Sequence, residues 1–318
     1  MADTVLVVGA GSIGRRHFDN LKHLGARAEL MPWRSFDAKT VSERRDIVAM
    51  VIATQTPVRL ELITLCAQND WPFYAEKPLA WTKAQVAKIY DAAAPVAARS
   101  MVGFMMRYHP VLRALAAMDL SRVFRIHAEI GHDVRKWRAN WQFSTSYAAQ
   151  AQGGGVLLDL CHEIDLVAAL FAPLTLQDGR SMGHRDFAGV DFATSLHVTT
   201  AQGAAGHIAM DYLSPVFTRK MVLSGLDMRI EADFQTATLN VQRLDQSGQA
   251  AQVTQTFPFQ RNDMFIDAMR DFLAIIAAQP PSHDPLRPCF DTMRSTCDLI
   301  AHAWETRRFS GNVDFDVT

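Results

Sequence analysis

The chain has 318 residues, of which 49% are hydrophobic, and its formal net charge at pH 7 is −1. This length and composition allow two domains, each with its own core. The near-neutral charge argues against a nucleic-acid partner or an anionic-membrane partner. No apolar stretch is long enough to span a membrane, and the short apolar run at residues 4–8 lacks the basic residues that begin a signal peptide.

The cysteine pattern gives no sign of a metal site. The four cysteines are scattered along the chain, at Cys66, Cys161, Cys289 and Cys297. We interpret most of them as buried apolar residues in a reducing compartment. Together with the missing membrane span, this predicts a cytoplasmic protein without a metal.

The first predicted strand, residues 5–8, leads into a glycine-rich turn and then into an amphipathic helix at residues 13–24. In a Gly-x-Gly-x-x-Gly turn, the first glycine allows a tight bend, the second lets a pyrophosphate approach the backbone, and the third lets the helix pack closely. The helix start then faces the phosphates with unpaired N–H groups. We therefore predict cofactor contacts at Gly9, Gly11, Ser12, Ile13 and Gly14. The alternative is a purely structural turn.

The second predicted strand, residues 28–31, ends without a carboxylate, in the sequence Pro-Trp-Arg-Ser-Phe. An NAD-selective site usually has an acidic residue here that binds the ribose hydroxyls. Arg34 can instead pair with a 2′-phosphate, and Ser35 can donate a hydrogen bond to it. We predict NADP(H) as the cofactor. The alternative is use of both cofactors, and a short loop that returned Asp37 to the ribose would favour NAD.

Strands and helices continue to alternate up to about residue 118. Further strands are predicted at residues 46–53, 73–75 and 101–104, and further helices at residues 60–68 and 83–92. This alternation predicts a doubly wound parallel α/β sheet, which we assign to a Rossmann domain at residues 1–119. Ligands of such sheets bind outside the carboxyl ends of the strands. Thr54 follows the third strand and Glu76-Lys77-Pro78 ends the fourth, so we predict cofactor contacts at Thr54, Glu76 and Lys77. A solvated surface lysine is the alternative for Lys77.

From residue 120 onward the pattern changes to longer strands joined by short glycine-containing links. We predict strands at residues 123–130, 194–200, 206–213, 218–224, 228–233, 238–244 and 253–257, and helices at residues 156–171, 264–278 and 290–307. This pattern predicts a second, α+β domain at residues 120–318 with an open, mostly antiparallel sheet. We expect apolar residues on the open face to form the interface of a homodimer or homotetramer. The residues that suggest this are Ile208, Met210, Val222, Leu223 and Ile230.

A run of three glycines opens the predicted helix at residues 156–171. Asp159, His162 and Glu163 share one face of this helix. A histidine flanked by carboxylates is suited to general base catalysis. The alternative is a surface helix with acidic residues in its first turns, where the helix dipole favours them. A His-Glu-x-x-His zinc site is excluded, because position 166 is leucine.

Two segments combine basic and aromatic residues. The first, residues 103–110, contains Arg107 and His109, and the second, residues 135–141, contains Arg138 and Trp141. Tryptophan can stack on the apolar face of a sugar, and arginine can bind a carboxylate or phosphate. We take these four residues and Glu163 as candidate substrate contacts, and expect the substrate to carry an anionic group. The alternatives are a basic loop with packing aromatics and a neutral sugar.

Taken in this order, the motifs resemble the glucose–fructose oxidoreductase / inositol dehydrogenase family. The resemblance covers nearly the whole chain, from residues 9–17 to the closing helices with Asn262 and Phe265 and on to Ser310-Gly311. It implies an NAD(P)-dependent oxidoreductase with a carbohydrate or polyol substrate. It also implies that Lys77 is the active-site lysine, joined to Pro78 by a cis bond, and that Asp159 and His162 are the acid/histidine pair.

The spacing of that pair departs from the usual family pattern. The histidine follows the aspartate by three residues instead of four, and Glu163 takes the usual place, which resembles a branch associated with acidic or amino sugars. We favour His162 as the group that takes the hydroxyl proton, because neutral imidazole accepts a proton near neutral pH; Glu163 is the alternative. Two other functions stay open: a non-catalytic dinucleotide-responsive regulator, and an enzyme whose transient oxidation serves elimination, glycoside cleavage or epimerisation.

Overall fold

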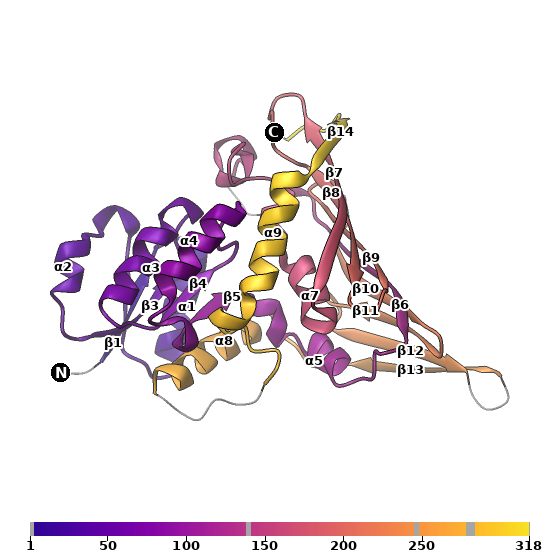
Figure 1. The fold of residues 1–318 in the computed structure, drawn as a ribbon, viewed down its shortest axis with the longest axis horizontal. Helices are drawn as coiled ribbons and strands as arrows, with labels where there is room; N and C mark the ends of the chain where they lie inside the picture. The colour runs from indigo at the N-terminus through magenta and orange to yellow at the C-terminus, as the bar shows by residue number, and fades with distance from the viewer. Residues whose placement is uncertain (1–2, 138–140, 245–247, 278–283, 318) are drawn as a thin grey trace. The chain divides into compact units, whose positions relative to one another are not determined.

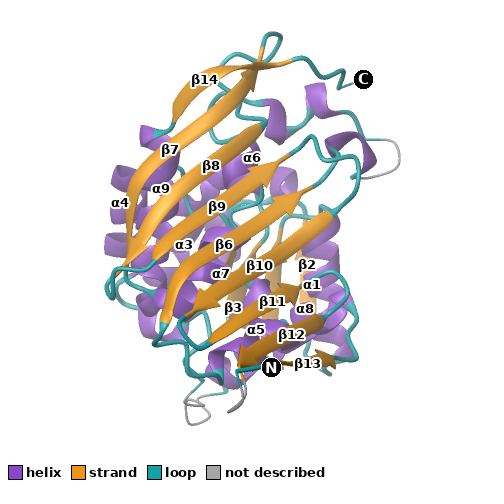
Figure 2. Cartoon of the chain, turned by 90° about the vertical axis from the view of Figure 1, so that its right-hand side faces the viewer, coloured by secondary structure: helices purple, strands orange, loops and turns teal. Residues whose placement is uncertain are grey.

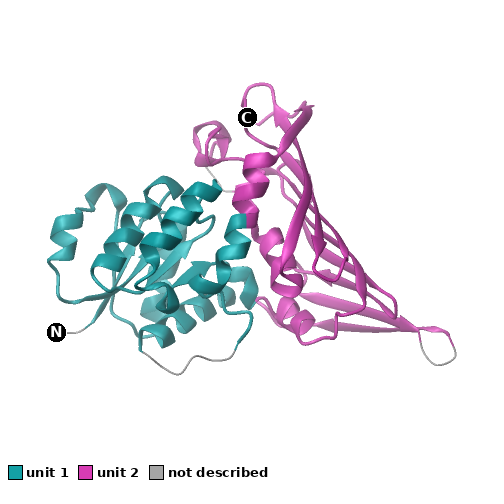
Figure 3. Cartoon of the chain, viewed as in Figure 1, with its two compact units in different colours: residues 1–108, 260–298 teal, residues 109–259, 299–318 magenta. Residues whose placement is uncertain are grey.

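The computed structural model describes residues 3–137, 141–244, 248–277 and 284–317, and its strands form one sheet of five and one of nine (Figure 1, Figure 2). The chain divides into two compact units (Figure 3). Unit 1 contains residues 1–108 and 260–298, and unit 2 contains residues 109–259 and 299–318. Within the described ranges, no helix is both long enough and apolar enough to cross a membrane.

Unit 1 is built on a parallel sheet with strand order β2-β1-β3-β4-β5. The strands are β1 (Thr4–Val8), β2 (Ala28–Met31), β3 (Ile47–Ile52), β4 (Phe73–Glu76) and β5 (Met101–Gly103). The helices between them are α1 (Ser12–His23), α2 (Ala38–Ser42), α3 (Arg59–Gln68) and α4 (Lys83–Ala93). All of β1 and all but one residue of β3 are buried, as expected for strands covered on both faces. The predicted parallel α/β sheet is confirmed.

Unit 1 also includes α8 (Arg261–Ile276), which comes from late in the chain and packs against α1. Asn262 at the start of α8 donates a hydrogen bond from Nδ2 to Oδ1 of Asn20 on α1, at 2.9 Å. The compact units therefore do not follow the predicted linear boundary at residue 119, because a C-terminal helix returns to the first unit.

Unit 2 is built on a sheet with strand order β13-β12-β11-β10-β6-β9-β8-β7-β14 (Figure 2). Its strands are β6 (Val123–Gly131), β7 (Leu174–His184), β8 (Ala193–Thr200), β9 (Ala205–Asp211), β10 (Thr218–Gly225), β11 (Met228–Asp233), β12 (Thr238–Leu244), β13 (Ala250–Thr256) and β14 (Arg308–Val313). Most neighbours are antiparallel, whereas β6 pairs with β9, and β7 with β14, in parallel. The predicted open, mostly antiparallel sheet is confirmed, although the sequence pattern did not predict β7 and β14.

The two faces of this sheet differ in polarity. One face packs against α6 (Val156–Asp159) and α7 (His162–Phe171). It holds four of the residues that we expected on the open face, each at most 1% exposed: Ile208, Met210, Leu223 and Ile230. That expectation was wrong for these four, because the alternation of the strands turns them towards the helices. Val222 does lie on the other face, in register with His127.

The outer face carries a row of histidines across three neighbouring strands. His127 on β6, His207 on β9 and His197 on β8 are in register. Successive ring centroids are 5.0 Å apart. Burial, followed by the charges of the two neighbouring histidines, lowers the pKa of His207. The centre of the outer face is therefore polar rather than apolar.

The assignment of faces predicts different costs for two apolar truncations. Ile208→Ala should lower the free energy of unfolding by about 2–5 kcal/mol, because it leaves a cavity on the helix side of the sheet. Val222→Ala is the matched control on the outer face and should cost less than about 1 kcal/mol. Urea unfolding of both variants measures the difference. Equal losses would contradict the assignment.

Candidate functional site

The glycine-rich turn of unit 1 is tightly packed at two positions and open at the third. A Cβ on Gly14 would lie 1.7 Å from the carbonyl oxygen of Gly9, and a Cβ on Gly9 would lie 2.4 Å from that of Ala53. Gly9 also has a φ of +108°, in the region that favours glycine. A Cβ on Gly11, by contrast, would meet no atom of the described chain within 4 Å. The turn thus brings bare backbone to an open space.

Helix α1 begins at the edge of that space. Gly11 is its N-cap, no described side chain caps it, and its first turn, which begins with Ser12 and Ile13, has no acidic residue. Its first N–H groups and the positive end of its dipole are therefore suited to an anion. The cradle that a Cβ of Gly11 would fill fits a pyrophosphate.

Two predicted cofactor residues directly follow β2. Arg34 and Ser35 lie in a short 3-10 turn, Trp33–Ser35, after Pro32. Asp37 instead caps α2, because its carboxylate accepts a hydrogen bond from the Thr40 backbone N–H at 2.7 Å. Hydrogen bonds from Thr40 lower the pKa of Asp37. The carboxylate is thus held towards α2.

Thr54, Glu76 and Lys77 occupy the carboxyl ends of β3 and β4. Buried Arg59 connects these strand ends through Nη2, which donates to the carbonyl oxygens of Thr54 at 3.1 Å and of Lys77 at 3.5 Å. The Lys77–Pro78 bond is cis, as predicted.

The partner of Glu76 was not predicted from the sequence. His17 on α1 has no exposed surface, and its Nε2 lies 2.7 Å from Oε1 of Glu76. The signal was present in the sequence, because His17 follows Gly14 by three residues and so lies on the same, strand-facing side of α1.

In unit 2 the predicted helix at residues 156–171 is two helices, α6 and α7. Gly155 begins α6 with a φ of +92°, and a Cβ there would lie 2.1 Å from Oδ1 of Asp191. Asp191 is fully buried; it accepts a hydrogen bond from Leu157 N at 2.8 Å and lies 3.2 Å from Nε of Arg307. The glycine run therefore lets a buried carboxylate hold the start of α6. Asp159 ends this helix and His162 begins the next.

Asp159 is bound by two tyrosines that its sequence neighbourhood did not indicate. Tyr147 donates to Oδ1 and Tyr212 donates to Oδ2, each at 2.8 Å. Burial, with the nearby charge of Asp159, raises the pKa of Tyr212 well above its usual value. Two hydroxyl donors suit an ionised carboxylate, so the arrangement fixes the position of Asp159.

His162 and Glu163 begin α7 and are 4% and 1% exposed. Glu163 forms a two-point ion pair with Arg219 on β10. The Nε–Oε1 distance is 2.7 Å and the Nη2–Oε2 distance is 3.3 Å. The carboxylate of Glu163 is therefore held by β10, and no sequence spacing indicated Arg219 as its partner.

His109 has a local structural role. Its Nδ1 accepts a hydrogen bond from Val111 N at 3.2 Å and caps α5 (Pro110–Ala116), and its Nε2 lies 3.1 Å from the carbonyl oxygen of Phe234. Burial lowers the pKa of His109 to about 4. Arg107, two residues before His109, is 7% exposed and belongs to unit 1. A substrate contact for either residue stays a prediction.

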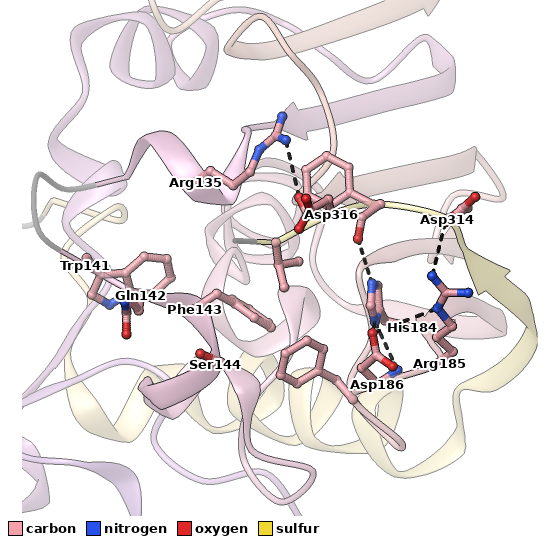
Figure 4. A pocket seen from close by; sticks show the side chains of 13 residues that line it. Arg135, Trp141, Gln142, Phe143, Ser144, His184, Arg185, Asp186, Asp314 and Asp316 are labelled. Carbon is pink, nitrogen blue, oxygen red and sulfur yellow. Dashed lines mark hydrogen bonds and ion pairs between the residues drawn. The ribbon is translucent and has the colours of Figure 1, made fainter.

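Trp141 lines a cavity of about 600 Å³ within unit 2 (Figure 4). Phe143, in the same wall, packs against Tyr212 with ring centroids 5.8 Å apart. Arg135 also lines the cavity, but its guanidinium is bound twice to Asp133, at 2.9 Å each. Asp133 thus offsets part of the positive charge predicted for this segment. Arg138 lies outside the described residues.

The described part of the chain has no group of three or more histidine, cysteine, aspartate or glutamate side chains arranged to hold a metal ion. The polar groups described above cluster within each unit. In unit 1 they are the free N–H groups at the start of α1, and in unit 2 they are Asp159 and Glu163 with their partners.

Residues 108–232 match the model of the GFO/IDH/MocA C-terminal domain. This match supports the family resemblance of the motifs. The chain is similar to trans-1,2-dihydrobenzene-1,2-diol dehydrogenase of Xenopus tropicalis, with 29% identity over 157 residues, 48% of this chain and 45% of that protein. It is also similar to inositol 2-dehydrogenase of Acidothermus cellulolyticus, with 28% identity over 185 residues, 52% of each chain. The chain thus spans about half the length of the curated relatives it matches.

Solved structures share the fold over nearly the whole chain. UDP-N-acetylglucosamine 3-dehydrogenase GnnA from Acidithiobacillus ferrooxidans has a TM-score of 0.76 at 17% identity and covers 96% of this chain and 97% of its own. Levoglucosan dehydrogenase in complex with NADH has a TM-score of 0.78 at 17% identity and covers 96% of both chains. KijD10, a 3-ketoreductase from Actinomadura kijaniata in complex with NADP and TDP-benzene, has a TM-score of 0.74 at 18% identity, covering 98% of this chain and all of its own.

The glycine geometry predicts opposite behaviour for two substitutions. Gly11→Ala should leave the melting temperature unchanged, because its Cβ meets open space, yet raise the Kd for the dinucleotide by about tenfold or more. Gly14→Ala should destabilise unit 1 by more than about 2 kcal/mol, because its Cβ overlaps the Gly9 carbonyl. Thermal unfolding and calorimetric titration measure the two effects. Unchanged dinucleotide affinity in Gly11→Ala would refute the phosphate cradle.

The lowered pKa of His109 predicts an acid-sensitive unit 2. Below the unfolded pKa of about 6.5, the unfolded chain binds a proton that the folded chain does not bind until about pH 4, so stability falls as pH falls through this window. Between about pH 7 and about pH 5 the free energy of unfolding should fall by about 2 kcal/mol. His109→Asn keeps a capping acceptor and should remove this part of the slope in urea unfolding. Identical slopes for the two proteins would contradict the assignment.

Proposed function

We propose that the chain is an NAD(P)-dependent oxidoreductase that moves a hydride between a nicotinamide cofactor and a hydroxyl or carbonyl group of a sugar, sugar acid or polyol. The observation that carries the proposal is the open backbone at Gly11, above the start of α1 in a parallel α/β unit. The names of the relatives support it, since they are dehydrogenases, and two of the related structures are complexes with NADH or NADP.

Each predicted catalytic residue has one role in this proposal. A bound nicotinamide supplies the hydride chemistry. Lys77 donates a hydrogen bond to the reacting oxygen and stabilises negative charge on it. His162 exchanges the hydroxyl proton, and Asp159 orients the histidine or the sugar. These roles follow from the family resemblance and from the surroundings of each residue within its own unit.

We propose His162 rather than Glu163 as the general base. The support is the buried ion pair of Glu163, whose two carboxylate oxygens lie 2.7 and 3.3 Å from guanidinium nitrogens of Arg219. Moving that carboxylate to a substrate would break both of its contacts with the Arg219 side chain, which is only 13% exposed.

We propose NADP(H) as the preferred cofactor. The end of β2 offers Arg34 and Ser35 to a 2′-phosphate, and Asp37 is engaged in capping α2. A guanidinium can bind a phosphate through two hydrogen bonds, whereas a carboxylate at this place would repel it.

We propose an anionic substrate and a homo-oligomeric assembly, each on a smaller set of features than the sequence first offered. Because Asp133 offsets the charge of Arg135, the proposal of an anionic substrate now depends on Arg107 and Arg138. The proposal of a homodimer or homotetramer now depends on the broad outer face of the nine-stranded sheet rather than on the apolar residues first expected there.

Loss of the proposed base or the lysine should stop turnover without unfolding the protein. With polyols, aldoses and sugar acids as substrates, Lys77→Met and His162→Ala should lower kcat by about 10²–10⁴ with little change in melting temperature. Nicotinamide absorbance measures the net reaction and separates a dehydrogenase from a regulator or an enzyme of transient oxidation. If Glu163→Gln were inactive and His162→Ala active, Glu163 would be the base.

Arg34 should determine the choice of cofactor. Arg34→Asp should lower kcat/KM for NADP relative to NAD by about 10²-fold, because the substitution replaces a phosphate partner with a like charge. Arg45→Asp makes the same change of charge at an exposed position of unit 1 and should leave the ratio unchanged. A wild-type preference for NAD would overturn the assignment.

A further inference from the structure

The contact between Glu76 and His17 is unusually enclosed for a group at a strand end. The His17 ring has no exposed surface and packs edge-on against Tyr74 and Phe265, with centroids 5.1 and 5.9 Å away. Its Nε2 is 2.7 Å from Oε1 of Glu76, and its Nδ1 is buried without a hydrogen-bond partner in the described chain.

This geometry determines where the protons lie. A proton on Nδ1 would be a buried donor without an acceptor, which is costly. His17 therefore carries its single proton on Nε2 and donates it to an ionised Glu76. The pair is a neutral imidazole and a carboxylate, so the negative charge of Glu76 is not cancelled by its partner.

The Glu76 carboxylate lies in the half of the sheet that, in folds of this type, binds the second mononucleotide of a dinucleotide. The strand order β2-β1-β3-β4-β5 places the switch point between β1 and β3. Arg34 follows β2 on one side of that point, and Glu76 ends β4 on the other. Gly103 at the end of β5 keeps the space beside the carboxylate clear, since a Cβ there would lie 3.0 Å from Cδ of Glu76.

We propose that Glu76, held ionised by His17, makes the site distinguish the oxidised cofactor from the reduced one. With this charge, the site binds the oxidised form more tightly than it would without it. The inference rests on the proposed function, because it needs a nicotinamide at this end of the sheet. The oxidised ring carries a positive charge that the reduced ring lacks, so a fixed carboxylate stabilises only the oxidised form. His17 is a positioning residue that acts through Glu76.

The charge of Glu76 also shifts the equilibrium of the reaction between bound cofactor and bound substrate. Reduction transfers a hydride, with its two electrons, from the reduced ring to a carbonyl carbon, and a proton to the oxygen, leaving a hydroxyl and the oxidised ring. Tighter binding of the oxidised ring shifts this equilibrium on the protein towards the hydroxyl by the same factor. Lys77, the next residue, has the opposite charge and should act in the opposite sense.

The test compares two dissociation constants in one variant. Glu76→Gln keeps an oxygen that can accept from His17 but removes the charge. Calorimetric titration with NADP⁺ and NADPH should show that Kd(NADP⁺)/Kd(NADPH) rises by about three- to tenfold. His17→Leu should shift the ratio in the same direction, and adding it to Glu76→Gln should shift the ratio no further. Lys77→Met should lower the ratio.

A matched control separates charge from structure. Glu61→Gln removes an exposed carboxylate at the start of α3 and should leave both constants unchanged. If Glu76→Gln raised both constants in the same proportion, Glu76 would be merely structural and the inference overturned. If Glu76→Gln did not fold, an unchanged ratio in Lys77→Met would overturn it. If the wild type bound neither NADP(H) nor NAD(H), the proposed function itself would fail.

Discussion

The close approach of α1 to the turn after β1 is the constraint on which the cofactor side of this protein depends. Because a Cβ on Gly14 would lie 1.7 Å from the Gly9 carbonyl oxygen, only glycine lets the helix start there. The same helix begins at Gly11, brings His17 to Glu76 one turn after Gly14, and offers Asn20 to α8 one turn after that. This one steric condition thus positions three features of the unit: the proposed phosphate cradle, the histidine partner of Glu76, and the contact between α1 and α8.

The second unit gives neighbouring acidic groups different partners, and those partners separate their roles. Tyrosine hydroxyls hold Asp159, a guanidinium holds Glu163, and Asp191 is buried beneath the glycine run with Arg307. Buried carboxylates need such compensation, so their surroundings limit which of them can exchange a proton. This is the basis for proposing a histidine rather than an acid as the base.

Much of the fold could be predicted from local patterns, and the main errors came from contacts between distant residues. Apolar runs and glycine positions predicted β1, β3 and α1 because their signals are local. The start of α6 is held by Asp191, which lies 34 residues from Leu157 in sequence. Alternation alone did not tell which face of a strand meets a helix, so Ile208 was assigned to the wrong face. The partners Arg219 and Tyr212 could not be predicted, because sheet register brings them into place.

Isotope transfer tests most directly whether the chain moves a hydride between a nicotinamide and a carbohydrate. The wild-type protein would be incubated with NADPH deuterated at both C4 positions and a panel of keto sugars and keto sugar acids, and the products analysed by mass spectrometry. We expect one deuterium on the carbon of each new hydroxyl group, and labelling that is slower by about 10²-fold or more with His162→Ala. Products labelled only from deuterated solvent, or no product from any carbonyl substrate with either NADPH or NADH, would contradict it.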